Sequence, residues 1–452
     1  MTGELLLRRV EVGARAGLDV LIRDGRVAEI GTGLACHGEE IDGQGGALIP
    51  GLSDHHIHIL GLAARRQSVD LQSARGSEEF ARQLRDAAAS RRPGQWLRAI
   101  GYHEQVAGPL DRARLDRIAP NVPVRVQHQT GALWILNSEA LARLPLENPS
   151  EGLDRESGWL WRGDAWLKAA LGAEVPDMAP VGRELAAYGV IALTDASVTT
   201  EATAAELLAK AHRDGDLPQR LTLMSGEGLE APSDAAFTVG PVKVLLDDAE
   251  LIDLDDFCGR IEQARHWGRN VAVHCVTAGE LALTLAAFET TGARSGDRIE
   301  HGGMISPLAI AEIRRLGLKV ATQPAFLLER GDRYLATIDA SEHDDLYRCA
   351  SLLRAGIPVL GSSDAPYASP NPWAGMAAAV ERRTARGAPV GQEERLSPRQ
   401  ALALYAVRPS IQVGDPADLC LLPVSLNEAL DDLAAMCPIL TLIGGQIAHL
   451  TL

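Results

Sequence analysis

The sequence predicts an α/β fold: a (β/α)8 barrel of the TIM type with a small β-sandwich domain formed by the two ends of the chain. Two patterns support this. The middle of the chain alternates short apolar strands with helical segments, as parallel barrels do, whereas both ends show the two-residue alternation of half-buried strands. The length of 452 residues also exceeds what one compact core usually holds.

The terminal strands come first along the chain. Three segments between residues 4 and 30 alternate apolar and polar side chains, and Asp24-Gly25 supplies a turn between two of them. They predict a small antiparallel sheet. The same alternation returns on both sides of Gly444-Gly445. We therefore expect residues 1–50 and 410–452 to pair into one β-sandwich domain.

The remaining residues, 51–409, are expected to form the barrel. A typical unit opens a helix at Ser306-Pro307, closes it at Gly317 and continues as a strand over 318–322. An inserted, lid-like segment is expected around residues 100–175, because five of the seven tryptophans lie between Trp96 and Trp166, within a long segment between barrel strands.

Composition limits the partners. The chain has 44 basic and 60 acidic residues, a formal charge of -16, which opposes binding to nucleic acid and to anionic membranes. Its six cysteines show no Cys-x-x-Cys spacing, and no apolar run reaches about 18 residues. We expect a cytoplasmic protein with reduced thiols and a small-molecule substrate; a homo-oligomer is compatible with the sequence.

A metal-binding strand is indicated at residues 54–58, Asp-His-His-Ile-His. In an extended strand successive side chains alternate faces, so Asp54, His56 and His58 point one way and His55 the other. Two imidazoles on one face can share a metal ion. Taken alone, the same pattern also fits ordinary polar residues at a strand end.

Three further candidates follow apolar runs, where a barrel places its functional side chains. His274 follows 271–273, His301 closes the next strand, and Asp364 follows 357–363. Each has a structural alternative: a hydrogen-bonded core histidine for the first two, a helix cap for the third. Their joint placement at strand ends favours a metal site.

Lys243 interrupts an apolar strand between Val242 and Val244. A desolvated lysine loses its proton more easily, and the neutral amine can react with carbon dioxide to give a carbamate that bridges two metal ions. Alternatively, the side chain extends to the strand end or pairs with Asp247 or Asp248. Both interpretations remain open from the sequence.

Residues 49–58 resemble the opening signature of the amidohydrolase superfamily. Residues 20–31 are similar to its N-terminal sheet and 413–419 to its C-terminal return. Within the superfamily the chain most resembles the branch containing N-substituted formamide deformylases. The segments that are similar to this branch are 96–104, 115–120, 137–141, 240–243 and 361–366.

The resemblance implies a hydrolase of a C–N bond in an amide, N-formyl compound or cyclic amide, with one or two divalent ions, by default Zn²⁺. Its implied ligands are His56, His58, Lys243 as its carbamate, His274, His301 and Asp364. Asp364 would take a proton from metal-activated water and return it to the leaving nitrogen, and His301 belongs to the same catalytic group.

Substrate contacts are less defined. Many members of this branch have a histidine where this chain has residues 131–134, so His103 or His128 is a candidate replacement donor to the substrate carbonyl. Trp161, within a tryptophan-rich part of the insertion, is a candidate wall of an apolar pocket. The alternative is a surface or packing role for His103 and His128 and a packing role for Trp161.

Two other functions remain as alternatives. One is a one-metal deaminase or lactone hydrolase on the same scaffold, in which Lys243 is structural and His301 contacts the transition state. The other is a barrel that binds ligands without catalysis. Such a protein would have lost ligands, whereas every expected ligand type is present here in order.

Overall fold

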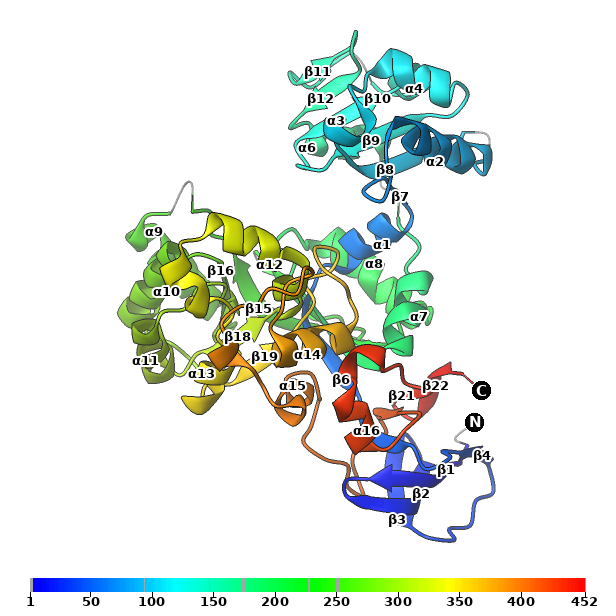
Figure 1. Ribbon diagram of the computed structural model, residues 1–452, viewed down its shortest axis with the longest axis vertical. Helices are drawn as coiled ribbons and strands as arrows, with labels where there is room; N and C mark the ends of the chain where they lie inside the picture. Colours follow the sequence, from blue (N-terminus) through cyan, green and yellow to red (C-terminus); the bar gives the residue numbers. More distant parts are fainter. Residues whose placement is uncertain are drawn as a thin grey trace. The chain divides into compact units, whose positions relative to one another are not determined.

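The computed structural model of the protein, shown in Figure 1, describes residues 3–92, 94–145, 147–172, 175–226, 228–248 and 252–451. Residues 1–2 and 452 of the predicted terminal domain lie outside these ranges. The chain divides into two compact units. One contains the chain up to Ile59 and from Met178 onward, and the other runs from Leu60 to Asp177.

The first unit contains a sheet of eight parallel strands. In chain order they are β6 (Leu52–Ile57), β13 (Val190–Asp195), β14 (Arg220–Ser225), β15 (Thr238–Val244), β16 (Val271–Cys275), β17 (Arg298–His301), β18 (Lys319–Thr322) and β19 (Val359–Gly361). Beyond β19, the Asp364 N–H donates to the His56 carbonyl of β6 at 2.8 Å. The sheet is therefore a nearly closed barrel, which confirms the predicted fold class.

Helices connect these strands, and those near β16 pack their apolar sides into the main core of the unit. The predicted boundaries of one unit are confirmed: Ser306 caps α11 (Pro307–Leu316) by accepting from Ala309 N, and Gly317 ends it in the left-handed region, φ 67°. The other helices of this unit are α7 (Ala179–Ala187), α8 (Ala202–Arg213), α9 (Leu254–His266), α10 (Ala278–Thr291), α12 (Ala325–Thr337), α13 (Cys349–Arg354), α14 (Pro372–Glu381), α15 (Pro398–Ala403) and α16 (Leu426–Asp431), with 3-10 turns at Ala340–Asp345, Gln392–Glu394 and Leu433–Ala435.

The two chain ends form one mixed sheet of eight strands (Figure 1). Its members are β1 (Leu5–Val12), β2 (Arg15–Arg23), β3 (Arg26–Gly31), β4 (Glu39–Asp42), β5 (Ala47–Pro50), β20 (Leu419–Leu421), β21 (Leu440–Ile443) and β22 (Gln446–Leu450). The pairing of β1, β2 and β3 is antiparallel, as predicted. However, β1 pairs in parallel with β4 and β5, because the chain crosses back after β3 to the start of β1 and then runs beside β1 in the same direction.

The second unit has its own six-stranded sheet, in the order β11-β12-β10-β9-β8-β7. Its strands are β7 (Val69–Asp70), β8 (Leu97–Tyr102), β9 (Val124–His128), β10 (Leu133–Leu136), β11 (Leu153–Asp154) and β12 (Trp159–Trp161). Its helices are α2 (Ser77–Ala89), α3 (Glu104–Ala107), α4 (Arg112–Ile118), α5 (Ser138–Leu141) and α6 (Asp164–Leu171). Helix α1 (Ile59–Arg66) begins at the division between the units. Two apolar clusters of its own support it. Among the described residues no helix is long and apolar enough to cross a membrane.

Candidate metal centre

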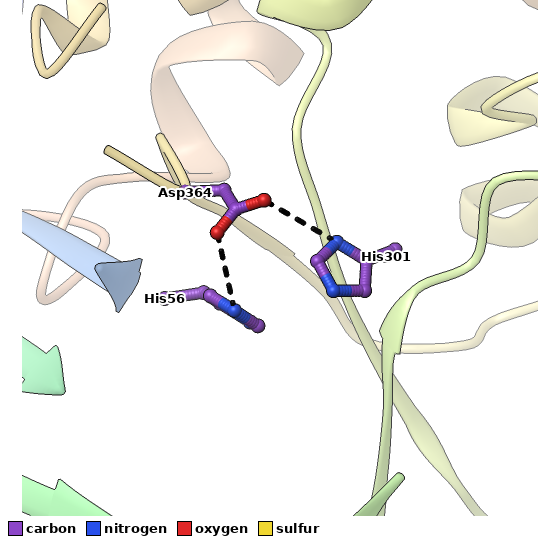
Figure 2. A group of neighbouring side chains, drawn as sticks. All are labelled: His56, His301 and Asp364. Carbon is purple, nitrogen blue, oxygen red and sulfur yellow. Dashed lines mark ion pairs between the residues drawn. The ribbon is translucent and has the colours of Figure 1, made fainter. Parts of the chain in front are cut away.

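Three buried side chains meet at the carboxyl edge of the barrel sheet (Figure 2). One ligand atom each from His56, His301 and Asp364 lies within 4.8 Å of the others. His56 belongs to β6, His301 ends β17, and Asp364 follows β19. Because all strands of a parallel barrel end at the same edge, residues far apart in the sequence converge there.

The orientation of His56 is determined by a buried carboxylate. Its Nδ1 contacts Glu300, and the same carboxylate accepts from Arg298 Nε. Arg298 in turn donates to the His55 carbonyl at 2.8 Å. Since an ionised carboxylate only accepts, His56 carries its proton on Nδ1 and presents the lone pair of Nε2.

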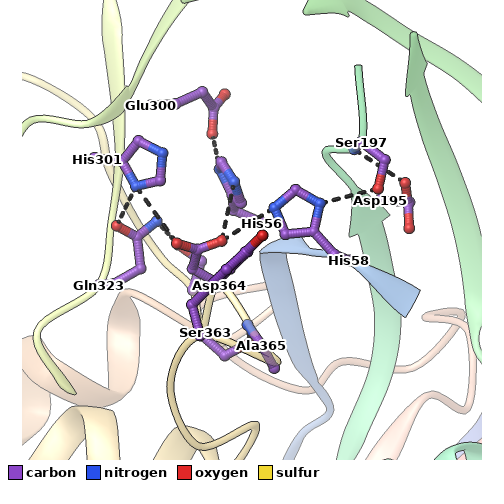
Figure 3. Close-up of polar contacts among 12 residues, drawn as sticks. His56, His58, Asp195, Ser197, Glu300, His301, Gln323, Ser363, Asp364 and Ala365 are labelled. Carbon is purple, nitrogen blue, oxygen red and sulfur yellow. Dashed lines mark hydrogen bonds and ion pairs between the residues drawn. The ribbon is translucent and has the colours of Figure 1, made fainter. Parts of the chain in front are cut away.

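A hydrogen-bonded chain orients His301 in the same way (Figure 3). Ser362 Oγ donates to the Thr322 carbonyl and accepts from Gln323 Nε2, both at 3.0 Å. This places Gln323 Oε1 toward His301 Nδ1, 2.9 Å away. Nδ1 therefore donates, and the Nε2 of His301 also carries a lone pair.

Asp364 brings a third acceptor. Its Oδ1 is buried and has no hydrogen-bond partner among the described residues. His56 Nε2 lies 3.6 Å from it and His58 Nε2 3.1 Å, the latter within ion-pair distance but without hydrogen-bond geometry. A lone pair that faces an unpaired carboxylate oxygen is unfavourable unless a cation lies between them. This donor set fits a divalent ion of the zinc type.

The loop beyond β13 supports His58. Ser197 Oγ contacts its Nδ1 at 2.9 Å, and Asp195 holds this loop by accepting from the Ser197 N–H at 3.0 Å (Figure 3). Asp54 performs a similar function for the Asp364 loop, because its carboxylate accepts from both Oγ and N–H of Ser363. Asp54 is itself buried, which raises its pKa to about 6.

His274 and Lys243 lie on the neighbouring strands β16 and β15. The ring of His274 is 4.4 Å from that of His301, centroid to centroid. Lys243 is 4% exposed, and its Nζ has no hydrogen-bond partner among the described residues. Like Asp364 Oδ1, the amine is a buried polar atom without a hydrogen-bond partner among the residues that the structure describes.

Burial lowers the pKa values of several basic groups of this centre. It lowers the pKa of His274 to about 4 and those of His56 and His301 well below their ordinary value, and the nearby Lys243 charge adds to each decrease. Burial also lowers the pKa of Lys243. Neutral imidazoles and a neutral amine are the forms that bind metal or react with carbon dioxide.

The three predicted substrate contacts all belong to the second unit. His103 follows β8 and His128 ends β9; Glu104 Oε2 lies 3.0 Å from His128 Nε2. His103 Nδ1 accepts from Gln105 N at 3.0 Å, so its proton is on Nε2. Trp161 of β12 is 50% exposed. Their contact with a substrate stays a prediction.

The supporting residues Glu300, Gln323 and Ser197 were not singled out as functional from the sequence. Only Glu300 has a usable signal, a carboxylate directly before a candidate ligand at a strand end. The other two act through contacts between different strands, for which the linear sequence contains no marker.

A profile of the amidohydrolase family matches residues 39–449. N-substituted formamide deformylase of Arthrobacter pascens is 24% identical over 92% of each chain, and protein LONG AFTER FAR-RED 3 of Arabidopsis thaliana is 22% identical over 80% of this chain and 74% of its own. An uncharacterized metal-dependent hydrolase from Pyrococcus horikoshii OT3 shares the fold, with a TM-score of 0.76 at 19% identity over 93% of this chain and 97% of that chain. Since the family profile covers most of the sequence, the chain belongs to the amidohydrolase family.

Proposed function

We propose that the protein hydrolyses a C–N bond in a small amide, N-formyl compound or cyclic amide, with one or two divalent metal ions and zinc as the first candidate. The supporting observation is that one ligand atom each from His56, His301 and Asp364 lies within 4.8 Å of the others, while Asp364 Oδ1 has no hydrogen-bond partner among the described residues. The name of the Arthrobacter pascens relative, a deformylase of N-substituted formamides, favours a C–N bond.

The proposed ligands are those at the carboxyl edge of the barrel. They are His56, His58, Lys243, His274, His301 and Asp364. An ion bound there would polarise a carbonyl group and lower the pKa of water. The protein supplies neutral imidazoles, a single inward carboxylate and fixed ring orientations, so little reorganisation is needed when the ion enters.

Asp364 is the proposed proton carrier. Its carboxylate is proposed to accept a proton from the attacking water and to return that proton to the leaving nitrogen. Its position is constrained on both sides, because its N–H donates to the His56 carbonyl and Ser363 is held by Asp54.

Lys243 is proposed to become a carbamate. Its neutral amine would attack carbon dioxide, form an N–C bond and release one proton, which leaves a carboxylate-like group that can bridge two ions. The modification would also remove a buried, unpaired amine, because no described residue accepts a hydrogen bond from Lys243 Nζ.

The one-metal hydrolase is a second candidate, favoured by one observation. Within the barrel unit, ligand atoms of His56, His301 and Asp364 all lie within 4.8 Å of one another, and three protein ligands suffice for a single ion. In that case Lys243 keeps its amine, and deamination of a heterocycle or lactone hydrolysis is expected.

The test is a substrate screen with zinc-loaded protein over N-formyl amines, N-acyl compounds, lactams, lactones and aminated heterocycles. We expect turnover of the C–N substrates and its loss, roughly 1,000-fold or more, in Asp364→Asn but not in the exposed control Asp431→Asn. Activity confined to aminated heterocycles or lactones would support the second candidate.

Metal counting and a carbon label distinguish the two-metal candidate from the one-metal candidate independently of the substrate screen. With ¹³C-bicarbonate, wild-type protein should give a carbamate signal that Lys243→Met lacks, together with two ions per chain. One ion and no signal would contradict the two-metal proposal.

A further inference from the structure

A second polar feature lies beside the metal centre in the barrel unit. Tyr367 follows Asp364 by three residues, and its ring is 5.6 Å from that of His58. Arg330 lies on α12, the helix that begins just after Gln323, and its Nη2 donates to the Tyr367 carbonyl at 2.9 Å. Along the chain, Tyr367 therefore comes shortly after Asp364, and Arg330 belongs to the helix that comes shortly after Gln323.

Aromatic packing holds the guanidinium in place. Its carbon lies 4.0 Å from the centroid of the Phe326 ring, which is 3% exposed. Phe326 in turn packs against Tyr347, in a cluster of buried apolar residues on this side of the barrel. An arginine that stacks on a buried ring loses little freedom when it binds a ligand.

The charge of Arg330 has no partner of opposite sign. No carboxylate of the described residues lies within ion-pair distance of it, although the protein has 60 acidic residues and a formal charge of -16. The neighbouring Tyr367 side chain is 60% exposed.

We propose that Arg330 binds a carboxylate of the substrate, with the exposed ring of Tyr367 beside it, so that the preferred substrates are carboxylate-bearing amides or N-formyl compounds. A guanidinium offers five N–H donors in a planar fork, and among the described residues Arg330 forms one hydrogen bond, to the Tyr367 carbonyl. This inference rests on the proposed function, because it names the substrate class of the same centre.

The test compares two substrates that differ only in the carboxylate, an N-formyl amino acid and the matching N-formyl amine. Arg330→Gln should lower kcat/KM for the acid roughly 10- to 100-fold, mainly through KM, and change the amine less than about twofold. Arg330→Lys should recover part of the loss, because it keeps the charge without the fork. Arg333→Gln, an exposed arginine of the same helix, is the matched control and should leave both substrates unchanged.

Binding of benzoate, followed by NMR titration of wild type and Arg330→Gln, gives a readout that needs no turnover. Weaker binding in Arg330→Gln together with an inactive wild type would contradict the proposed function and leave the carboxylate site supported. Equal benzoate binding in both proteins, or an equal loss of kcat/KM for acid and amine, would overturn the inference.

Discussion

Glu300→Gln tests whether the buried carboxylate behind His56 prepares the metal centre. In the wild type, Glu300 is fully buried and accepts from both His56 Nδ1 and Arg298 Nε. The glutamine has nearly the same volume but only one accepting atom. One of the two donors must then face the NH₂ group, so either the histidine or the arginine loses its partner.

Two magnitudes follow. Loss of an outer partner of a metal-binding histidine typically lowers metal affinity roughly 10- to 100-fold, about 1.4 to 2.8 kcal/mol. Removal of one charge of a buried ion pair costs roughly 3 to 5 kcal/mol of folding free energy, because Arg298, with a side chain 8% exposed, is left without its countercharge. We therefore expect both weaker zinc binding and a lower unfolding midpoint.

Zinc affinity is measured by competition with a chromophoric chelator, and stability by thermal unfolding of the metal-free protein. The control is Glu289→Gln, which removes an exposed carboxylate paired with Arg315 and should change neither quantity appreciably. Unchanged zinc affinity in a folded Glu300→Gln protein would refute the assigned role of this carboxylate.

Three further outcomes are expected. Lys243→Met removes a buried amine without a hydrogen-bond partner among the described residues, so the thermal midpoint of the metal-free protein should stay equal or rise; a clear decrease would contradict this. In metal-free protein, burial lowers the pKa values of His55 and His274 from 6.5 to about 4, so the unfolded chain binds more protons between these values and stability falls as pH falls. Burial raises the pKa of Asp54 from 3.8 to about 6, which opposes one of the two histidines, so these three groups together give a loss of about 1.4 kcal/mol per pH unit between pH 6 and 4. The lowered pKa values of His56 and His301 add to this loss, which urea unfolding measures; a stability that does not change with pH would exclude it. Gln323→Leu removes the acceptor of the His301 Nδ1–H and should weaken zinc binding roughly tenfold or more by chelator competition, whereas wild-type affinity would show that this amide is dispensable.

Local sequence patterns predicted much of the fold because they reflect burial along single elements. The alternation near both termini predicted strands that pair into one sheet, and Ser306 with Gly317 marked both ends of a helix. The parallel pairing of β1 with β4 and β5 was not predicted, since strand direction depends on where the connecting chain crosses, and that is not encoded in alternation.

The candidate ligands could be selected from the sequence because chemistry-bearing residues at the ends of apolar runs stand out from their surroundings. His56, His301 and Asp364 were all selected in this way, and the structure brings their ligand atoms together. The position of Lys243 within an apolar strand likewise marked it as unusual before its burial was known.

By itself, the sequence determined the barrel class, the family resemblance and the residue types available to a metal ion. The tertiary structure decided how the rings of His56 and His301 are oriented, through Glu300 and Gln323, and left Arg330 without a countercharge among the described residues. The physical reason is that protonation and orientation depend on partners within a few ångströms in space, and these partners belong to different strands and helices of the chain.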